Sequence, residues 1–491
     1  MHTAPVDTVI FVHGYSVRDL NSFNKLPDLL QADGIAGAAI YLAGFVSLDD
    51  YLGCDDLAKA LEQRIVSLVA EHGIDLGKTM LVAHSTGAIV ARRWILDRRA
   101  AKKLARSTTT LSHFMSCAGA NHGSTMAQLG RTELAYLFRT LTQGQSVGKR
   151  VLEDLDYGSE FLRELNREWM DAWNDPADPL YADTFCFSMG GSDHSFWQNH
   201  LTWQSHEAGS DGTVRISGAN LNYRWISVPG GAAGEYRLET LVQPAPHLVV
   251  ELGTERYSHT SQNAPDTQQL VISGINAVDD IAHGFKSPGS LVSASTLGIV
   301  DGVTTKTQRP YTALREAMAV DTVADFQALE QTWGQQTGAW SATHADAVNS
   351  TVVLTVYDGM GGVVDDTLVI LRDTGGTIAG ASGSILDNQP IRNQASPGIV
   401  SLYQNFPAFE KTHPHSVHIE ARTDTPFVAE AIADAPLSSD DNHVIAANAF
   451  TYVDVVLPRD PNAAMVVYRA SDVSPATLTG LFPPFADGWL T

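Results

Sequence analysis

The chain has 491 residues, of which 44% are hydrophobic and 18% are charged, a composition typical of globular proteins. At about 150 residues per domain, this length predicts about two to four domains. The 32 basic and 55 acidic residues give a net charge of −23, which argues against binding of nucleic acid or of anionic lipid by charge alone, because both require clustered cations.

The first part of the chain, to about residue 285, alternates strand-like and helix-like patterns. This alternation predicts an α/β domain with a largely parallel sheet covered by helices. Short apolar runs indicate buried strands over residues 9–12, 38–45, 79–83, 111–117, 184–188 and 248–252. Apolar residues at spacings of three and four predict a helix from about Leu57 that ends near Gly73, and residues 88–96 read as a second helix.

Residues 124–175 interrupt this alternation with helical patterns. The interruption follows the carboxyl end of a predicted strand, so the inserted helices would lie above the sheet. We therefore predict a lid over about residues 124–178.

After about residue 286 the pattern changes to a linker-like cluster at 287–290, a helical stretch at 309–333, and strands. Residues 351–357 and 367–371 flank a glycine-rich turn, which predicts a hairpin, and residues 416–421 and 451–457 read as further strands. The predicted division is 1–286 for the α/β domain, 287–345 for a linker with a helical segment, and 346–491 for a β-rich domain, either a sandwich or a barrel.

The strongest chemical signal is Ala83-His84-Ser85-Thr86-Gly87, which lies between a predicted strand and a predicted helix. A serine on such a tight turn is presented above the sheet, and the turn requires small residues two positions to either side. Ala83 and Gly87 meet this requirement. The pattern indicates Ser85 as a nucleophile, and an ordinary turn with an incidental serine is the structural alternative.

A second signal, His13-Gly14-Tyr15, directly follows the first predicted strand. Acyl transfer develops negative charge on a carbonyl oxygen, and each preorganised N–H donor stabilises that charge by ~3 kcal/mol. We predict the backbone of Thr86 as one donor and the backbone of Tyr15 as the other, with Gly14 allowing close approach. Taken alone, this tripeptide is at least as readily a structural turn.

A serine nucleophile needs a base, and the base needs a carboxylate to orient it. Asp211-Gly212-Thr213-Val214 predicts a carboxylate on a tight turn at the edge of the sheet, with Asp211 as the acid. Asp-Gly pairs are also common in surface turns. Asp183 and Asp193 are the alternative acids.

In the chain order Ser, Asp, His, the base follows the acid. The histidines nearest in sequence after Asp211 are His247, His259 and His283. His259 follows the predicted strand 248–252, at its carboxyl end, whereas His247 precedes that strand. We predict His259 as the base and keep His247 and His283 as alternatives.

These segments together resemble the α/β-hydrolase superfamily, and within it bacterial lipases and carboxylesterases. The resemblance covers about residues 6–285 and includes Ala120-Asn121-His122-Gly123-Ser124 and Gly158-Ser159-Glu160-Phe161-Leu162. It implies an α/β-hydrolase fold with a helical lid insertion, followed here by a C-terminal β-rich module. It also implies Ser85 as nucleophile, Asp211 as acid and His259 as base, with Tyr15 and Thr86 in the oxyanion hole.

The activity implied by the resemblance is hydrolysis of carboxylic esters through an acyl-enzyme, in the first place of lipid or acylglycerol esters. A thioesterase or an acyltransferase would use the same triad, and a non-catalytic binding protein could share the fold. By analogy with some lipases, the β-rich module is a candidate for contact with a lipid interface. The sequence does not predict an oligomeric state.

No cofactor or metal is predicted, because His194, His200 and His206 lack the spacing of metal ligands. The chain has 3 cysteines, too few for a disulfide framework. No signal peptide is recognisable before the first strand-like run, and residues 35–48, the longest nearly apolar run, are too short to span a bilayer. We expect a cytoplasmic protein, although a secreted protein without its leader would have the same pattern.

Overall fold

The structure, a computed structural model, describes the chain in segments. These are residues 6–14, 23, 26–40, 50–103, 110–124, 148–192, 209–211, 214–228, 237–251, 309–358, 361–364, 367–373, 376–377, 391–393, 398–405, 416–421, 432–436, 438–439, 442–443 and 445–457. Within these segments, no helix combines the length and the apolar character that crossing a bilayer requires.

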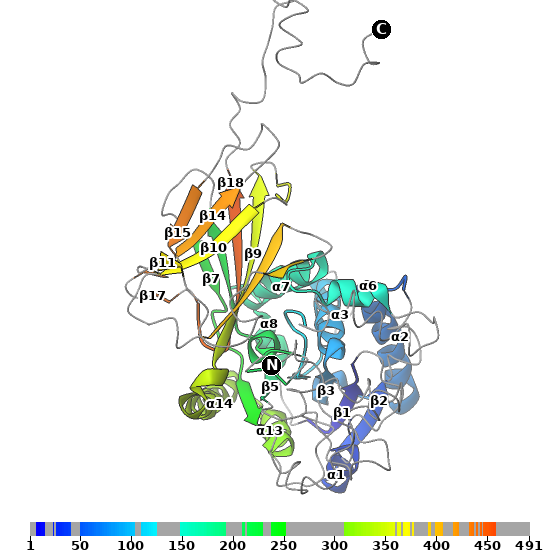
Figure 1. The fold of residues 1–491 in the computed structure, drawn as a ribbon. Helices are drawn as coiled ribbons and strands as arrows, with labels where there is room; N and C mark the ends of the chain where they lie inside the picture. The colour runs from blue at the N-terminus through cyan, green and yellow to red at the C-terminus, as the bar shows by residue number, and fades with distance from the viewer. Residues whose placement is uncertain are drawn as a thin grey trace, which may run out of the picture.

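A six-stranded sheet forms the centre of the α/β part (Figure 1). Its strands are β1 (Thr8–Val12), β2 (Ala36–Ile40), β3 (Thr79–His84), β4 (His113–Cys117), β5 (Phe185–Ser192) and β8 (His247–Glu251). They lie in the order β2-β1-β3-β4-β5-β8, and every neighbouring pair is parallel. Strands β3, β4 and β5 are buried along their whole length, as strands covered on both faces must be. The predicted parallel sheet is confirmed.

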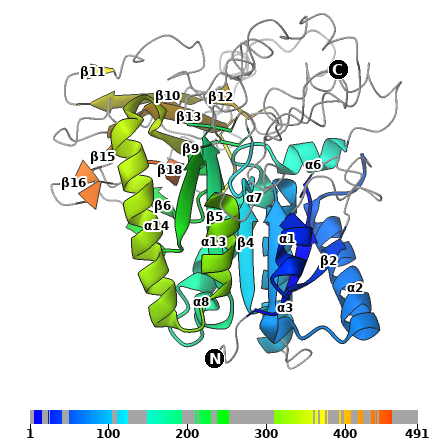
Figure 2. The same cartoon turned by 90° about the horizontal axis from the view of Figure 1, so that it is seen from below.

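Helices cover both faces of this sheet (Figure 2). The helices are α1 (Leu26–Ala32), α2 (Cys54–His72), α3 (Thr86–Lys103), α6 (Lys149–Asp154), α7 (Glu160–Trp173), α8 (Leu180–Asp183), α10 (Ile216–Ala219), α13 (Arg309–Met318) and α14 (Val323–Thr343). The predicted stop of α2 is confirmed, because Gly73 adopts the left-handed conformation, with φ 66°, that ends many helices.

Successive side chains of a strand point to opposite faces of the sheet, so Phe114 and Met115 of β4 mark the two faces. Phe114 contacts the ring of Trp169 on α7, with centroids 6.4 Å apart. Phe187 of β5 pairs with Met115 and so lies on the other face, where it contacts Phe326 and Trp333 of α14 at 5.4 and 6.0 Å. Helix α7 therefore covers one face and α14 the other.

The predicted helical insertion is present as α6 and α7. Helix α7 is fixed in the core, since Leu162, Leu165 and Trp169 are buried, and Ser159 Oγ caps its first turn by accepting the Leu162 N–H at 3.2 Å. The lid predicted over about residues 124–178 stays a prediction, and its residues 125–147 lie outside the described residues.

A second, β-rich part has two main sheets, of order β12-β13-β9-β18-β6-β7 and β11-β10-β14-β15, and a short pair, β16-β17 (Figure 1). Its strands are β6 (Tyr223–Val228), β7 (Arg237–Thr240), β9 (Asn349–Asp358), β10 (Thr367–Asp373), β11 (Gly376–Thr377), β12 (Ile391–Arg392), β13 (Ile399–Asn405), β14 (Ser416–Ala421), β15 (Ile432–Pro436), β16 (Ser438–Ser439), β17 (Asn442–His443) and β18 (Phe450–Leu457). The predicted C-terminal β-rich module is confirmed.

The hairpin predicted from residues 351–357 and 367–371 is wrong. Strand β9 pairs with β13 and β18, whereas β10 pairs with β11 and β14 in the other sheet. Residues 349–356 are all buried, which requires strand neighbours on both edges as well as cover on both faces. A single hairpin partner does not provide this, so β9 lies in the interior of the six-stranded sheet.

The sheets do not follow the predicted division of the chain at residues 286 and 345. Strands β6 and β7 precede residue 286 in sequence, yet β6 pairs in parallel with β18 of the β-rich part. Helices α13 and α14 follow it, yet α14 packs on the α/β sheet. As a statement about separately folding units, the division into 1–286, 287–345 and 346–491 stays a prediction, and the linker-like cluster at 287–290 lies outside the described residues.

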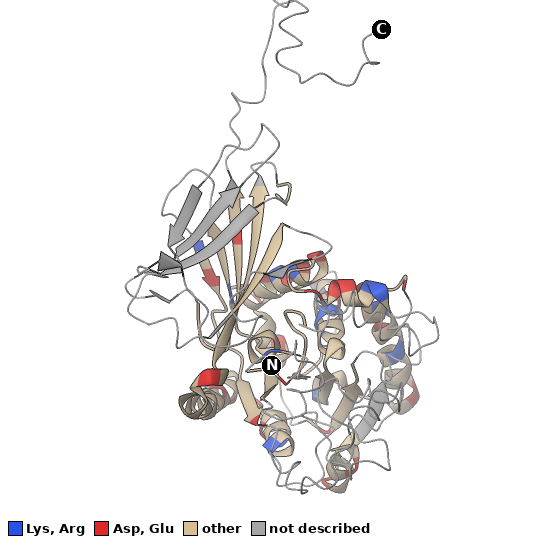
Figure 3. Cartoon of the chain, viewed as in Figure 1, with Lys and Arg blue, Asp and Glu red and all other residues tan. Residues whose placement is uncertain are grey.

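Charged residues of the described chain lie largely on the outer helices, with acidic and basic residues side by side (Figure 3). Several of them pair between neighbouring helices: Arg98 of α3 with Glu62 of α2 at 2.9 Å, and Arg93 of α3 with Glu168 of α7 at 2.8 Å. These pairs attach α2 and α7 to the two sides of α3.

Candidate active site

Ser85 occupies the turn between β3 and α3. It has a φ of 56°, in the left-handed region that costs a residue with a side chain about 1–2 kcal/mol. Of residues 79–92, all of them described, Ser85 alone is not fully buried. A strained strand–turn–helix that exposes a serine at the carboxyl end of a parallel strand is the geometry of a nucleophile elbow.

Two glycines make room for this turn. A Cβ on Gly87 would lie 2.5 Å from the carbonyl oxygen of His13, and a Cβ on Gly14 would lie 2.7 Å from Cβ of Ser85. Both distances are shorter than van der Waals contact allows. The turn therefore requires glycine at position 87, and Gly14 brings the loop after β1 directly against the Ser85 side chain.

The backbone beside Ser85 can hold an oxyanion. Thr86 is the first residue of α3, and the first N–H groups of a helix have no partner within it. The positive end of the helix dipole points to the same place. Tyr15, the other predicted donor, lies outside the described residues, while its neighbour Gly14 is in place: a Cβ built there would lie 3.2 Å from Ser85 Oγ.

The loop after β4 fixes the backbone of Ser85. The Ser85 N–H donates to the carbonyl of Cys117 at 3.2 Å, and the Ala120 N–H donates to the carbonyl of Ser85 at 3.3 Å. Asn121 Nδ2 continues the connection by donating to the carbonyl of Ala219 at 2.8 Å. Ala219 belongs to α10, so the loop after β4 links the serine turn to the segment that follows Asp211.

Asp211 is 1% exposed and lies on a closed turn. Its Oδ1 accepts the Val214 N–H at 2.8 Å, and Ser210 forms an antiparallel bridge with Arg215. The chain then enters α10, where Ala219 lies 3.5 Å from the position of a Cβ on Gly190 in β5. Helix α10, which directly follows the Asp211 turn, thus adjoins the carboxyl half of β5, at the edge of the sheet that carries Ser85.

The alternative acid Asp183 lies at the opposite edge. It ends α8, before β5 begins, and its carboxylate accepts Lys102 Nζ at 2.6 and 2.8 Å. An ion-paired carboxylate at the amino end of β5 cannot orient a base beside Ser85. Asp193, the other alternative, lies outside the described residues.

His247 is poorly placed to act as the base. It begins β8, a strand separated from β3 by β4 and β5, hence about 14 Å away at the usual strand spacing. Its Nδ1 lies 2.8 Å from Ser188 Oγ, and burial lowers its pKa to about 3. Strand β8 ends at Glu251 on the edge that carries Ser85, and His259 and His283 follow it, outside the described residues.

Sequence reasoning missed a buried arginine beneath the elbow. Arg92 of α3 donates to the carbonyl of Asn121 at 3.0 Å and to Asn166 Oδ1 at 2.9 Å, with its guanidinium 4.5 Å from the ring centre of Trp169. Burial lowers the pKa of Arg92. The only signal in the sequence is an arginine within an otherwise apolar helical stretch, because its partners lie on another helix and a loop.

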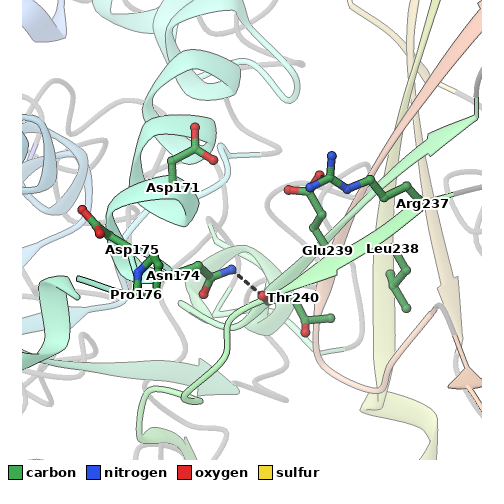
Figure 4. A pocket seen from close by; sticks show the side chains of 8 residues that line it. All are labelled: Asp171, Asn174, Asp175, Pro176, Arg237, Leu238, Glu239 and Thr240. Carbon is green, nitrogen blue, oxygen red and sulfur yellow. Dashed lines mark hydrogen bonds and ion pairs between the residues drawn. The ribbon is translucent and has the colours of Figure 1, made fainter. Parts of the chain in front are cut away.

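A polar hollow of about 590 Å³ lies elsewhere, between the end of α7 and β7 (Figure 4). Its lining residues are Asp171, Asn174, Asp175, Pro176, Arg237, Leu238, Glu239 and Thr240. Asp175 pairs with Arg99 at 3.6 Å, and Arg99 is about 20 Å along α3 from Thr86 at 1.5 Å per residue. This hollow is therefore remote from Ser85. Among the described residues, no group of three or more His, Cys, Asp or Glu is arranged to hold a metal ion, and His194, His200 and His206 lie outside them.

The chain is similar to a family of lipases and to several solved structures. The family model "Lipase (class 2)" matches residues 6–175. Phospholipase PlaB from Legionella pneumophila superposes with a TM-score of 0.72 at 20% identity, covering 95% of this chain and 97% of that one, and its complex with thio-NAD matches equally. Lipase BlEst2 from Bacillus licheniformis matches with a TM-score of 0.32 at 19% identity over 44% of this chain and 79% of that one. None of the curated proteins matches.

The chain has the α/β-hydrolase fold, and its likeness to the PlaB structure extends through the β-rich part. The resemblance to lipases and esterases inferred from the sequence is confirmed.

Proposed function

We propose that this α/β-hydrolase cleaves carboxylic esters of lipids, with Ser85 as the nucleophile of an acyl-enzyme mechanism. The observation that carries the proposal is the strained Ser85 turn between β3 and α3, crowded by Gly14 and Gly87. The match to class 2 lipases spans residues 6–175, which contain this turn, and supports a lipid ester as the substrate. The phospholipase named among the similar structures points to the same class of substrate.

In the proposed reaction, Ser85 Oγ attacks the acyl carbonyl while the imidazole of His259 takes its proton. The carboxylate of Asp211 accepts the other imidazole N–H and orients the ring. The N–H groups of Thr86 and Tyr15 donate to the oxyanion, at about 3 kcal/mol for each donor. The imidazolium then protonates the departing alcohol, and water, activated by the same imidazole, releases the acid and restores Ser85.

The described cysteines do not compete with Ser85 as nucleophiles. Cys54, Cys117 and Cys186 are buried, and burial raises the pKa of each thiol above its ordinary value. A buried thiol that stays protonated is inert, because the thiolate is the reactive form.

The direct test is Ser85→Ala assayed with p-nitrophenyl esters of increasing acyl length. We expect kcat to fall by about 10⁶-fold, as in other hydrolases that lose the nucleophile, and labelling by a fluorophosphonate probe to disappear. Ser67→Ala is the matched control, since Ser67 lies on the outer face of α2, where its Oγ donates to the carbonyl of Gln63. Hydrolysis by Ser85→Ala at the wild-type rate contradicts the proposal.

A wider substrate panel separates the related activities. Phospholipids, acylglycerols and acyl thioesters at matched acyl length, with and without an alcohol acceptor, divide lipase, thioesterase and acyltransferase chemistry. We expect the largest kcat/KM for long-chain oxygen esters. Preference for short chains would indicate a carboxylesterase, and a folded chain that neither labels nor hydrolyses any substrate would indicate a binding protein.

A further inference from the structure

We propose that the six-stranded sheet of the β-rich part positions the catalytic acid, and that Tyr403 and Arg215 are the positioning residues. The inference rests on the proposed role of Asp211 and extends it, because it assigns to the β-rich part a task within the hydrolytic site itself. Residues 209–211 and 214–220, which we call the acid loop, carry Asp211 and its connections to the β-rich part.

Arg215 anchors the acid loop between two aromatic rings. Its guanidinium is 0% exposed and lies 4.0 Å from the ring centre of Tyr403 on β13 and 4.7 Å from that of Tyr157. A cation desolvated between aromatic faces is held more strongly than one at the surface. Arg215 is bridged to Ser210, next to Asp211, so its position fixes the turn that carries the carboxylate.

The start of the acid loop rests on the same tyrosine. The Tyr403 hydroxyl donates to the carbonyl of Gly209 at 3.3 Å. Gly209 has a φ of 78°, and a Cβ there would collide with the carbonyl oxygen of Ala347, just before β9. The Ile216 N–H donates to the carbonyl of Gly209 at 2.9 Å and closes the loop. Tyr403 therefore contacts the acid loop twice, once through its ring and once through its hydroxyl.

The end of the acid loop is tied to the same sheet. Ser217 Oγ lies 2.6 Å from Thr351 Oγ1 on β9, and Asn220 Nδ2 donates to the carbonyl of Asn448, just before β18, at 2.9 Å. The acid loop is thus held at its beginning by β13 and at its end by β9 and the entry to β18.

These contacts decide where the carboxylate lies. The bond from Val214 to Asp211 fixes the shape of the turn, but it does not fix the place of the turn relative to Ser85, since both residues move together. The contacts of Tyr403 and Arg215 set that placement from the side of the β-rich part, while Asn121, which donates to the carbonyl of Ala219, sets it from the loop after β4. An orienting carboxylate is worth about 10⁴-fold in kcat, and a misplacement of about 1 Å costs about 10²-fold.

The test is a double-mutant cycle between Tyr403 and Asp211 on the full chain. We expect Tyr403→Leu to lower kcat by roughly 10- to 100-fold with KM unchanged, because Asp211 does not contact the substrate. Tyr403→Phe keeps the ring, loses only the hydroxyl, and should lower kcat by about 5-fold. In the Asp211→Asn background both changes should have no further effect on kcat, since the carboxylate that they position is gone.

Tyr357→Phe is the matched control. Tyr357 lies on β9, and its hydroxyl accepts Arg163 Nη2 at 2.7 Å, away from the acid loop. The Tyr357→Phe change should leave kcat unchanged in the wild type and in the Asp211→Asn variant. Equal losses of kcat from Tyr403→Phe with and without Asp211 would overturn the inference, and this variant keeps the test decisive if Tyr403→Leu fails to fold.

The Ser85→Ala variant separates this inference from the proposed function. If Ser85→Ala retained hydrolysis, both would be wrong. If Ser85→Ala is inactive and the losses from the Tyr403 and Asp211 variants are additive, only the inference is wrong.

Discussion

The serine turn and the acid loop, the two described regions of the proposed active site, are held in place by different means. Ser85 is fixed by its own strained backbone and by Gly14, Gly87 and the loop after β4, all within the first quarter of the chain. The acid loop has a short turn of its own and a tie to the loop after β4, through Asn121 and Ala219, but it is also held by the β-rich part. Three of its hydrogen bonds reach that part, and they join residues 134, 194 and 228 positions apart.

The position of the serine turn is therefore determined by residues close to it in sequence, which we call local encoding. The position of the acid loop is determined by residues far away in sequence, which we call long-range encoding. A strained turn needs specific residue types at fixed spacing, so mutation within a few positions destroys it. A loop placed by distant strands tolerates many local changes but responds to changes far away in sequence. The β-rich part should therefore influence catalysis mainly through the acid.

The largest expected effect concerns the base. His259→Ala should lower kcat by about 10⁶-fold, as much as Ser85→Ala, because the serine then keeps its proton. His247→Asn should stay within about 2-fold of wild type, since β4 and β5 separate His247 from β3 and it contacts Ser188. Steady-state hydrolysis of one ester by both variants and by His283→Ala measures this. A large loss of kcat in a folded His247→Asn variant would place the base at the beginning of β8 and contradict the assignment of His259.

The next effect tests the local encoding of the serine turn. Gly87→Ala places a methyl group 2.5 Å from the backbone of His13, so we expect a loss of about 2–3 kcal/mol in the free energy of unfolding and of about 10²-fold in kcat. Gly338→Ala is the control, because a Cβ there would meet no atom within 4 Å outside the adjacent helix backbone, and α14 should gain up to about 1 kcal/mol. Urea unfolding and ester hydrolysis measure both quantities. A stable, active Gly87→Ala would mean that the turn is not sterically fixed.

The same contrast explains how much the sequence predicted. Strands β1, β3 and β4 and the Ser85 turn follow from short apolar runs and from residues at fixed spacing, and these patterns are local. The Asp211 turn was also recognisable, because an Asp-Gly pair predicts a turn in any context. The bases His259 and His283 stay predictions, as does the donor Tyr15.

The pairing of strands that lie far apart in sequence was not predictable from local patterns. Strand β6 alternates buried Tyr223 and Trp225 with half-buried Arg224, a pattern that can reveal a strand but not its parallel pairing with β18. The wrong hairpin has the same cause, since a glycine-rich turn between two strands says nothing about which sheet each strand joins. The support of the acid loop by Tyr403 is likewise a property of the assembled sheets.

The pH dependence of the free energy of unfolding tests whether His247 is a buried structural residue and not the catalytic base. Burial lowers its pKa from an unfolded value near 6.5 to about 3, so between these values the unfolded chain binds a proton that the folded chain does not. The free energy of unfolding should therefore fall with decreasing pH, by up to about 1.4 kcal/mol per unit from this group. Urea unfolding from pH 7 to pH 4 should give a shallower decline for His247→Asn than for wild type. Burial also lowers the pKa of His122, but this contribution is the same in wild type and in His247→Asn and so does not affect their difference. Parallel declines of the two proteins with decreasing pH would contradict a buried, neutral His247.

The smallest expected effect comes from removing one of the distant contacts of the acid loop, that between Ser217 and Thr351 of β9. Thr351→Val conserves shape but leaves the buried Ser217 hydroxyl without its 2.6 Å partner, and should cost about 1–2 kcal/mol in the free energy of unfolding, with a several-fold loss of kcat. Adding Ser217→Ala removes the unpaired group, so the double variant should regain much of the stability. Its kcat should stay low, because the acid loop still lacks a tie to β9. Full recovery of kcat together with stability would mean that this contact only stabilises the fold, and that the acid is held by its own turn as Ser85 is.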